Sequence, residues 1–255
     1  MTQIIHAELA VTDCDARFLV NDIPVGALRH RRSVYSAVPI HEYLVKGLNT
    51  LKIIRSDTPP PKEEGAQDAD AAAASARLTI AAYAPGTTPG NDPGAVAAVL
   101  DYKAVDAAGK PVTQAESSVN LPQLPFAWSW QALPVVDWVN PRAVSVVYTF
   151  LKEFSARFQS GDANWIMAAL LPKMTDYCNA YSMDLRSEIA ELQGRMARRT
   201  ADPTFAMTPF AEADLALRPC AGGKLADCVI KSGEPVIRWR DARAGVNGAM
   251  MLRVG

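Results

Sequence analysis

The sequence predicts two domains: an all-β domain, followed by an α+β domain in which helices pack on a curved antiparallel sheet. Three observations lead to this fold class. Residues 1–134 contain short apolar runs separated by turn residues, residues 140–199 have the periodicity of amphipathic helices, and residues 213–254 return to short apolar runs. At 255 residues, the chain is long enough for two domains of ordinary size.

The first domain is expected over residues 1–134. Its apolar runs predict strands at Ile4–Val11, Arg17–Val20, Val34–Ile40, Leu78–Ala84, Val96–Val105 and Val112–Val119, with a further strand that begins at Asn49. Residues 56–76 are rich in proline, then in acidic residues, then in alanine, so they predict a mobile loop inside the domain. The boundary with the second domain is expected between Pro134 and Asn140.

The second domain, residues 140–255, is expected to begin with helices. Asn140 followed by Pro141 is typical of a helix start, and Gly161 of a helix end. Asp162 then caps a second helix that Pro172 ends or kinks. A short third helix is expected at residues 175–182 and a fourth at residues 184–199. Four strands follow, at Ala213–Cys220, Leu225–Ser232, Pro235–Arg240 and Val246–Val254.

Composition limits the partners and cofactors that the chain is expected to bind. The formal net charge is -1, so there is no basic field that would attract nucleic acid. No apolar run has the length of a membrane span, and the N-terminus lacks the pattern of a secretory signal, so we expect a cytoplasmic protein. The cysteines form no CxxC pair and the histidines have no ligand spacing, so we expect no metal and no cofactor. Cys220 and Cys228 flank a hairpin-like turn, where they are expected to be reduced thiols.

Two segments, "FLVNDIPVG" and "PIHEYLVKGLNTLKI" (Phe18 to Ile53), carry a resemblance to known proteins. They resemble the jelly-roll, galactose-binding-like β-sandwiches that accompany glycosidase catalytic domains. In this family the second segment crosses the end of the sandwich, so the resemblance implies that Leu44 is buried, Gly47 turns the chain and Asn49 ties the turn. The chain departs from the family pattern at Lys46, where proline is commoner.

The second domain resembles the cone-shaped NTF2-like superfamily. The resemblance rests on "VVYTFLKEFSARFQSGDANWIMAALLPKMTDY" and on the later segments "LRPCAGGKLADCVI" and "PVIRWRD". It implies a homodimer through the open sheet face. It also implies, for the enzymes of the family, an acid–base pair in the mouth of the cone. The chain has no histidine after His41, so such a pair would use Asp176 with Tyr177 or Tyr148.

Candidate binding residues fall into three groups. Trp128 and Trp130 are two residues apart, so on a strand they would share one face and could form either a sugar platform or a packing surface at the domain boundary. Arg29, Arg31 and Arg32 form the densest positive segment, suited to an acidic partner or a phosphate. Arg238 and Arg240 share one face of a late strand, and the resemblance implies that this sheet face is an interaction surface.

Three functional interpretations stay open at this stage. The first, which we favour, is a non-enzymatic binding or adaptor protein with a protein partner, for example a bacterial immunity or accessory protein for a secreted toxin. The second is a carbohydrate-binding accessory protein that uses the β-sandwich and Trp128. The third is an isomerase or dehydratase that uses the cone and Asp176. No GxSxG, Walker, GxGxxG or HExxH motif is present to support an enzyme of those classes.

Overall fold

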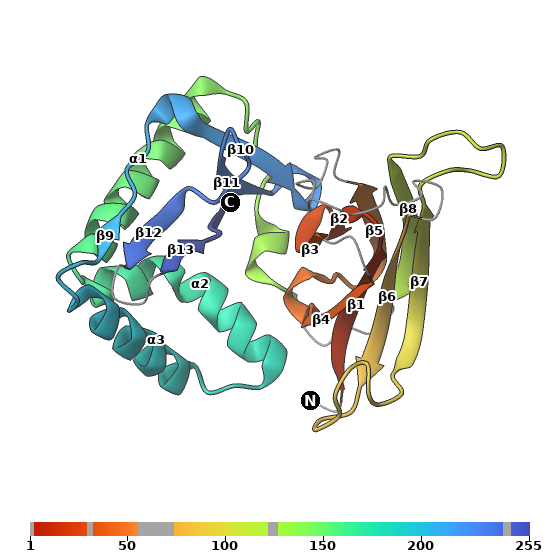
Figure 1. Ribbon diagram of the computed structural model, residues 1–255. Helices are drawn as coiled ribbons and strands as arrows, with labels where there is room; N and C mark the ends of the chain where they lie inside the picture. Colours follow the sequence, from red (N-terminus) through yellow and green to blue (C-terminus); the bar gives the residue numbers. More distant parts are fainter. Residues whose placement is uncertain (1–2, 30–32, 56–73, 122–126, 242–245) are drawn as a thin grey trace. The chain divides into compact units, whose positions relative to one another are not determined.

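The computed structural model describes residues 3–29, 33–55, 74–121, 127–241 and 246–255. In this part of the chain the structure is mostly β, with four antiparallel sheets and three α-helices (Figure 1). The chain divides into two compact units, Met1–Ala127 and Trp128–Gly255. The second unit therefore includes residues 128–134, which the sequence predicts to be part of the first domain, as well as residues 135–139, which it leaves between the two domains. The predicted loop at residues 56–76 lies outside the described residues as far as residue 73.

The first unit contains two four-stranded sheets. One has the strand order β4-β1-β6-β7 and the other has the order β3-β2-β5-β8. The strands of the first sheet are β1 (Ile4–Thr12), β4 (Val34–Pro39), β6 (Ser75–Tyr83) and β7 (Ala95–Lys103). Those of the second are β2 (Asp15–Val20), β3 (Ile23–Arg29), β5 (Gly47–Arg55) and β8 (Gln114–Leu121).

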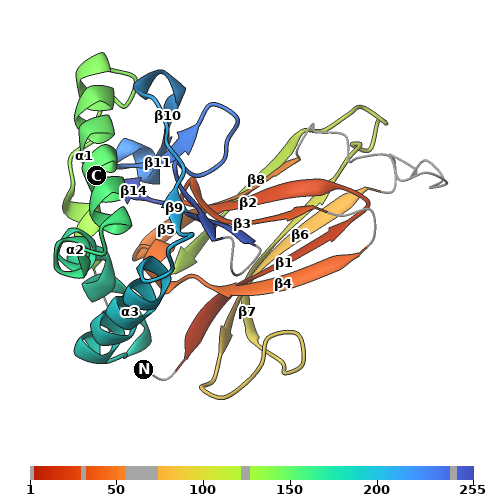
Figure 2. The ribbon, with the colours of Figure 1, turned by 60° about the vertical axis from the view of Figure 1, so that its left-hand side comes forward.

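Buried side chains from both sheets of the first unit form one hydrophobic cluster. Leu9 of β1 and Leu78 of β6 belong to it, together with Phe18 of β2 and Ile53 of β5. Every second residue of β1 from Ala7 to Val11 is buried, as expected for a strand with one face in the core. Figure 2 shows β2, β3 and β8 drawn above β1, β4 and β7.

The turn before β5 is organised by Asn49, as the resemblance implies. The side chain of Asn49 is fully buried, and its Nδ2 donates to the carbonyl oxygens of Val45 and Gly47 at 2.8 and 3.0 Å. Its Oδ1 accepts from the backbone N–H of Val45 and from Nδ2 of Asn21, both at 2.8 Å. Leu44 is buried and Gly47 has φ +99°, so all three parts of this expectation are confirmed.

The second unit contains three α-helices and two three-stranded sheets among its described residues. The helices are α1 (Pro141–Gln159), α2 (Ala163–Tyr181) and α3 (Leu185–Thr200), preceded by the 3-10 helix η2 (Ser129–Ala132). One sheet has the order β10-β11-β14 and the other the order β13-β12-β9. Their strands are β9 (Ala206–Met207), β10 (Leu215–Cys220), β11 (Leu225–Ile230), β12 (Ile237–Asp241), β13 (Val246–Met250) and β14 (Arg253–Val254).

The ends of α1 follow the prediction, whereas α2 does not. Oδ1 of Asn140 accepts from the backbone N–H of Arg142 at 2.9 Å, and Gly161 has φ +74°. The two helices expected on either side of Pro172 are one continuous helix. A proline removes only one hydrogen bond of the helix, and Pro172 lies on the exposed side. Buried residues before and after it, such as Met167 and Cys178, hold both halves in place.

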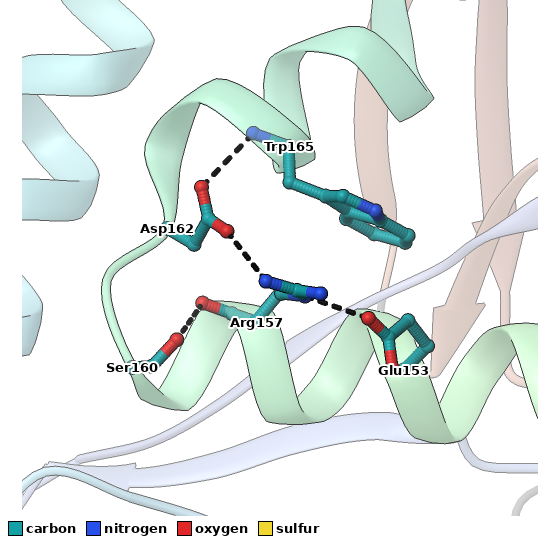
Figure 3. A network of polar contacts seen from close by, with 5 residues as sticks. All are labelled: Glu153, Arg157, Ser160, Asp162 and Trp165. Carbon is teal, nitrogen blue, oxygen red and sulfur yellow. Dashed lines mark hydrogen bonds and ion pairs between the residues drawn. The ribbon is translucent and has the colours of Figure 1, made fainter.

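A polar network fixes the corner between α1 and α2 (Figure 3). The guanidinium of Arg157 donates to Glu153 in its own helix at 2.6 Å and to Oδ2 of Asp162 at 3.0 Å. Oδ1 of Asp162 accepts from the backbone N–H of Trp165, which caps α2 as predicted. Arg157 also lies 6.0 Å from the centre of the Trp165 ring. One arginine thus joins the end of one helix to the start of the next.

Trp239 lies at the centre of the aromatic core of the second unit. Its ring stacks on Phe158 of α1 at a centroid distance of 5.9 Å, and the Arg199 guanidinium of α3 lies 4.6 Å from its centre. A Cβ at Gly248 would lie 2.1 Å from the indole, so only glycine fits opposite Trp239 in β13. This packing turns one face of β12 towards α1 and α3.

The last predicted strand is divided into two in the structure. β13 pairs with β12, whereas β14 pairs with β11 in the other sheet. Between them Leu252 is buried, and its carbonyl oxygen accepts from the backbone N–H of Cys228 at 2.9 Å. In β14, Nε of Arg253 donates to Oδ1 of Asp227, whose side chain is buried. The sequence shows one apolar run here because no turn residue lies between β13 and β14.

Candidate functional site

Asp176, the carboxylate of the expected acid–base pair, has a structural partner. Its Oδ2 accepts two hydrogen bonds from Ser129, one from the backbone N–H at 2.8 Å and one from the hydroxyl at 2.7 Å. Ser129 is the first residue of η2, so the carboxylate holds this helical turn against α2. This is the arrangement of a helix cap, in which a carboxylate satisfies a free backbone N–H.

The two tyrosines of the same hypothesis have partners in separate places. The Tyr148 ring of α1 packs edge-on against Phe210 at 5.8 Å, and Lys152 lies 5.6 Å from its centre. The Tyr177 ring of α2 lies 4.9 Å from that of Tyr181. These contacts are those of aromatic residues that pack a helix surface.

The two tryptophans of the sugar hypothesis do not lie on a strand. Trp128 is the residue before η2 and Trp130 lies within it, so the expectation that they share one strand face is wrong. The Trp128 side chain is only 3% exposed. A sugar platform requires exposed ring faces, and the burial of Trp128 leaves its ring unsuited to that role.

Arg238 and Arg240 do share one face of β12, opposite to that of Trp239. Arg240 is exposed and lies beside Asn247 of β13, which is also exposed. Arg238 is half-buried and donates to Glu234 at 2.8 Å, and its Nε has no hydrogen-bond partner among the described residues. None of the ion pairs in the described part of the chain includes Arg240. We call the outward side chains of Arg238, Arg240, Asn247 and Ala249 the arginine face.

The third group of candidate residues is not placed. Arg31 and Arg32 lie outside the described residues, and Arg29 ends β3 with only its backbone described. The structure therefore adds nothing to the expectation for this segment.

A polar cluster in the first unit was not found from the sequence. Glu8 of β1 accepts hydrogen bonds from two tyrosine hydroxyls, that of Tyr35 in β4 at 3.1 Å and that of Tyr83 in β6. Burial and the negative charge of Glu8 raise the pKa of both tyrosines to about 12. His6 contacts the Tyr83 ring edge-on at 5.4 Å. We call Glu8, Tyr35, Tyr83 and His6 the Glu8 cluster.

The sequence carries no local signal for this cluster because its members come from three strands. Tyr83 is 75 residues from Glu8 in the chain, and it reaches the carboxylate only through the pairing of β1 with β6. Alternation along β1 does place His6 and Glu8 on the same outward face. That signal alone would have pointed to the face but not to the tyrosines.

Comparisons with protein-family models, with curated proteins and with solved structures found no match. Function is therefore inferred from the side chains of this chain alone.

Potential metal ligands do not gather in one place among the described residues. No group of three or more His, Cys, Asp or Glu side chains with metal-binding geometry is found there. The four cysteines are free and buried, and burial raises the pKa of Cys228 to about 12. In the β10–β11 hairpin Cys228 pairs with Leu217 and Cys220 pairs with Leu225. Among the described helices, none combines the length and apolar character of a transmembrane segment.

His41 is a buried titratable group beneath the Glu8 cluster. It is 3% exposed, and its Nε2 accepts from the backbone N–H of Ile5 at 2.6 Å, so the ring is neutral with its proton on Nδ1. Burial, with a smaller effect of His6, lowers the pKa of His41 to about 4. Protonation of the ring would break the bond to Ile5 and place a charge in the core.

We expect acid to destabilise the first unit through His41. The unfolded chain takes up a proton near pH 6.5, whereas the folded ring does so only near pH 4, so stability is complete above pH 6.5 and falls as the pH approaches 4. The loss should reach about 3 kcal/mol. Urea unfolding at several pH values measures it, with His41→Gln as the non-titrating variant. An NMR titration that gives His41 an ordinary pKa would contradict this expectation.

Proposed function

We propose that this chain is a non-enzymatic binding protein whose arginine face contacts an acidic surface of a partner protein. The observation that carries the proposal is the geometry of β12. Trp239 anchors one face of this strand in the core, so the other face presents Arg240 and Arg238 outward on a rigid sheet. Arg240 is exposed beside the exposed residues Asn247 and Ala249, whereas Arg238 is half-buried.

Arginine is well suited to this role because its planar group forms paired hydrogen bonds with carboxylates. Arg240 has no intramolecular ion pair among the described residues, so an external carboxylate would not compete with an internal one. Arg238 is already paired with Glu234, so we expect it to contribute less than Arg240 to binding of the partner.

The geometry does not favour the enzymatic and the carbohydrate-binding interpretations. The carboxylate of Asp176 caps η2, and Trp128 is buried, so neither the proton-transfer reading nor the sugar reading gains from the geometry. Pairing of two arginine faces across a twofold axis would bring like charges together, which disfavours the homodimer expected through this sheet.

We propose that the first unit is a jelly-roll-like β-sandwich and the second an NTF2-like domain. A cytoplasmic immunity or accessory protein for a secreted toxin is the specific form of this function that we favour.

Reversal of the charge at Arg240 is expected to abolish partner capture. Tagged wild type, Arg240→Glu and the control Arg186→Glu would be compared in pull-downs from the native lysate, with mass spectrometry of what is recovered. Arg186 is an exposed arginine of α3 away from this face, so its reversal changes the net charge equally. We expect a stoichiometric protein that is recovered with wild type and the control, and is reduced about tenfold with Arg240→Glu.

The proposal fails if no protein is recovered, or if all three baits recover it equally. Recovery should also fall with added salt, because exposed charge pairs are screened. A protein whose recovery changes neither with salt nor with Arg240→Glu would bind elsewhere on the chain.

A further inference from the structure

The Glu8 cluster holds a carboxylate between two tyrosine hydroxyls in the sheet that contains β1. Glu8 lies on the outward face of β1, opposite Ala37 in β4 and Thr79 in β6. Glu8 itself is half-buried, and its carboxylate lies between the two tyrosine hydroxyls. Tyr35 is 47% exposed, and the chain at Gly90 approaches part of its ring, where a Cβ would lie 3.0 Å away.

The carboxylate lacks a cation within the described part of the molecule. None of the ion pairs formed there includes Glu8. Arg77, which lies opposite Ala10, is already paired with Asp101 at 2.6 Å. Both phenols act as donors to Glu8, and their raised pKa values keep them protonated at neutral pH. Among the described residues, the carboxylate of Glu8 is therefore held by hydroxyl donors and by no ion pair.

The cluster is also rigid. The Tyr83 ring lies under the chain that connects β6 to β7, where a Cβ at Gly94 would lie 2.6 Å from it. His6 contacts the same ring, and the backbone on both sides of Glu8 is paired with β4 and β6. A carboxylate that is held in place loses little conformational entropy when it binds.

We propose that the Glu8 cluster is a cation-recognition site that takes the guanidinium or ammonium group of a basic segment in a partner protein. The carboxylate would accept the charged N–H groups, and the exposed face of Tyr35 would stack on the cation. A carboxylate beside an aromatic face attracts cations through both the ion pair and the ring quadrupole. This site lies in the first unit and does not depend on the arginine face.

The alternative role of the cluster is purely structural. Glu8 would then serve only to fix the two tyrosines and, through Tyr83, the chain between β6 and β7. The two roles differ in what they require of charge and exposure. An anchor needs hydrogen-bond acceptors, whereas a cation site also needs the negative charge of Glu8 and the exposed ring of Tyr35.

Fluorescence anisotropy of a labelled hexa-arginine peptide at low ionic strength tests the proposal, with a hexa-citrulline peptide as the neutral isostere. We expect the full-length protein to bind the arginine peptide, and the citrulline peptide about tenfold more weakly. Glu8→Gln should lose about tenfold in affinity, and Tyr35→Ala about fivefold. Tyr35→Phe, which keeps the ring, should stay within about twofold of wild type. Glu212→Gln, which removes an exposed carboxylate elsewhere, should behave as wild type.

Several results would overturn the proposal. One is equal affinity for the two peptides, and another is equal weakening by Glu8→Gln and Glu212→Gln, which would indicate unspecific charge attraction. If Glu8→Gln unfolds, as thermal denaturation would show, the comparison of Tyr35→Ala with Tyr35→Phe decides. Full binding by Tyr35→Ala would leave the cluster with its structural role alone.

Discussion

Replacement of Arg253 with alanine is expected to lower the free energy of unfolding by about 4 kcal/mol. Asp227 is 3% exposed, and Arg253 donates to its carboxylate from the neighbouring strand β14. Removal of the guanidinium leaves a buried negative charge without that partner. The cost of such a charge exceeds the value of the intact pair. Denaturant unfolding of the full chain at neutral pH measures the change.

Two controls distinguish the cost of leaving a buried charge unpaired from the cost of losing an ion pair in general. Arg195→Ala removes the same type of side chain from an exposed ion pair with Glu191 in α3. It should lower the free energy of unfolding by less than about 1 kcal/mol. The double variant Asp227→Leu with Arg253→Met removes both charges and should recover most of the lost stability. Equal losses for Arg253→Ala and Arg195→Ala would show that burial of Asp227 has no energetic consequence.

Replacement of Asn49 with alanine is expected to destabilise the first unit by about 4 kcal/mol. The side chain is fully buried and takes part in four hydrogen bonds, which link Val45, Gly47 and Asn21. Alanine would leave each of these groups without its present partner, and each buried loss costs about 1 kcal/mol or more. Thermal unfolding together with amide exchange of Val45 measures the global and the local effect.

The matched control for Asn49 is Asn120→Ala on β8. Asn120 is exposed, so the same substitution there should change stability by less than about 0.5 kcal/mol. Asn49→Asp is informative as well, because it keeps one acceptor and loses both donors to Val45 and Gly47. If Asn49→Ala proves as mild as Asn120→Ala, the turn before β5 has another source of stability.

Local chemistry explains which parts of the fold could be predicted from the sequence. The start of α1 and the turn before β5 depend on residues within a few positions of each other, namely Asn140 and Asn49 with their neighbours. The continuity of α2 through Pro172 depends instead on buried residues at both ends of the helix. The division between β13 and β14 depends on pairing with β12 and β11, which the local sequence does not encode.

The candidate sites follow the same rule. Arg238 and Arg240 were predicted to share a face because alternation along one strand is a local property. The bonds from Ser129 to Asp176 could not be predicted from the sequence, because the two residues are 47 positions apart. The Glu8 cluster needs three strands in register before its members meet, so no pattern in one stretch of sequence identifies it.

The burial of the four thiols gives the protein an internal set of chemical probes. Cys14 belongs to the first unit, and Cys178, Cys220 and Cys228 belong to the second. A buried thiol reacts with an alkylating reagent only while its surroundings are open, so the reaction rate reports the free energy of that opening. Mass spectrometry can assign each modified cysteine, and the two units of one unlabelled chain can therefore be followed separately as they open.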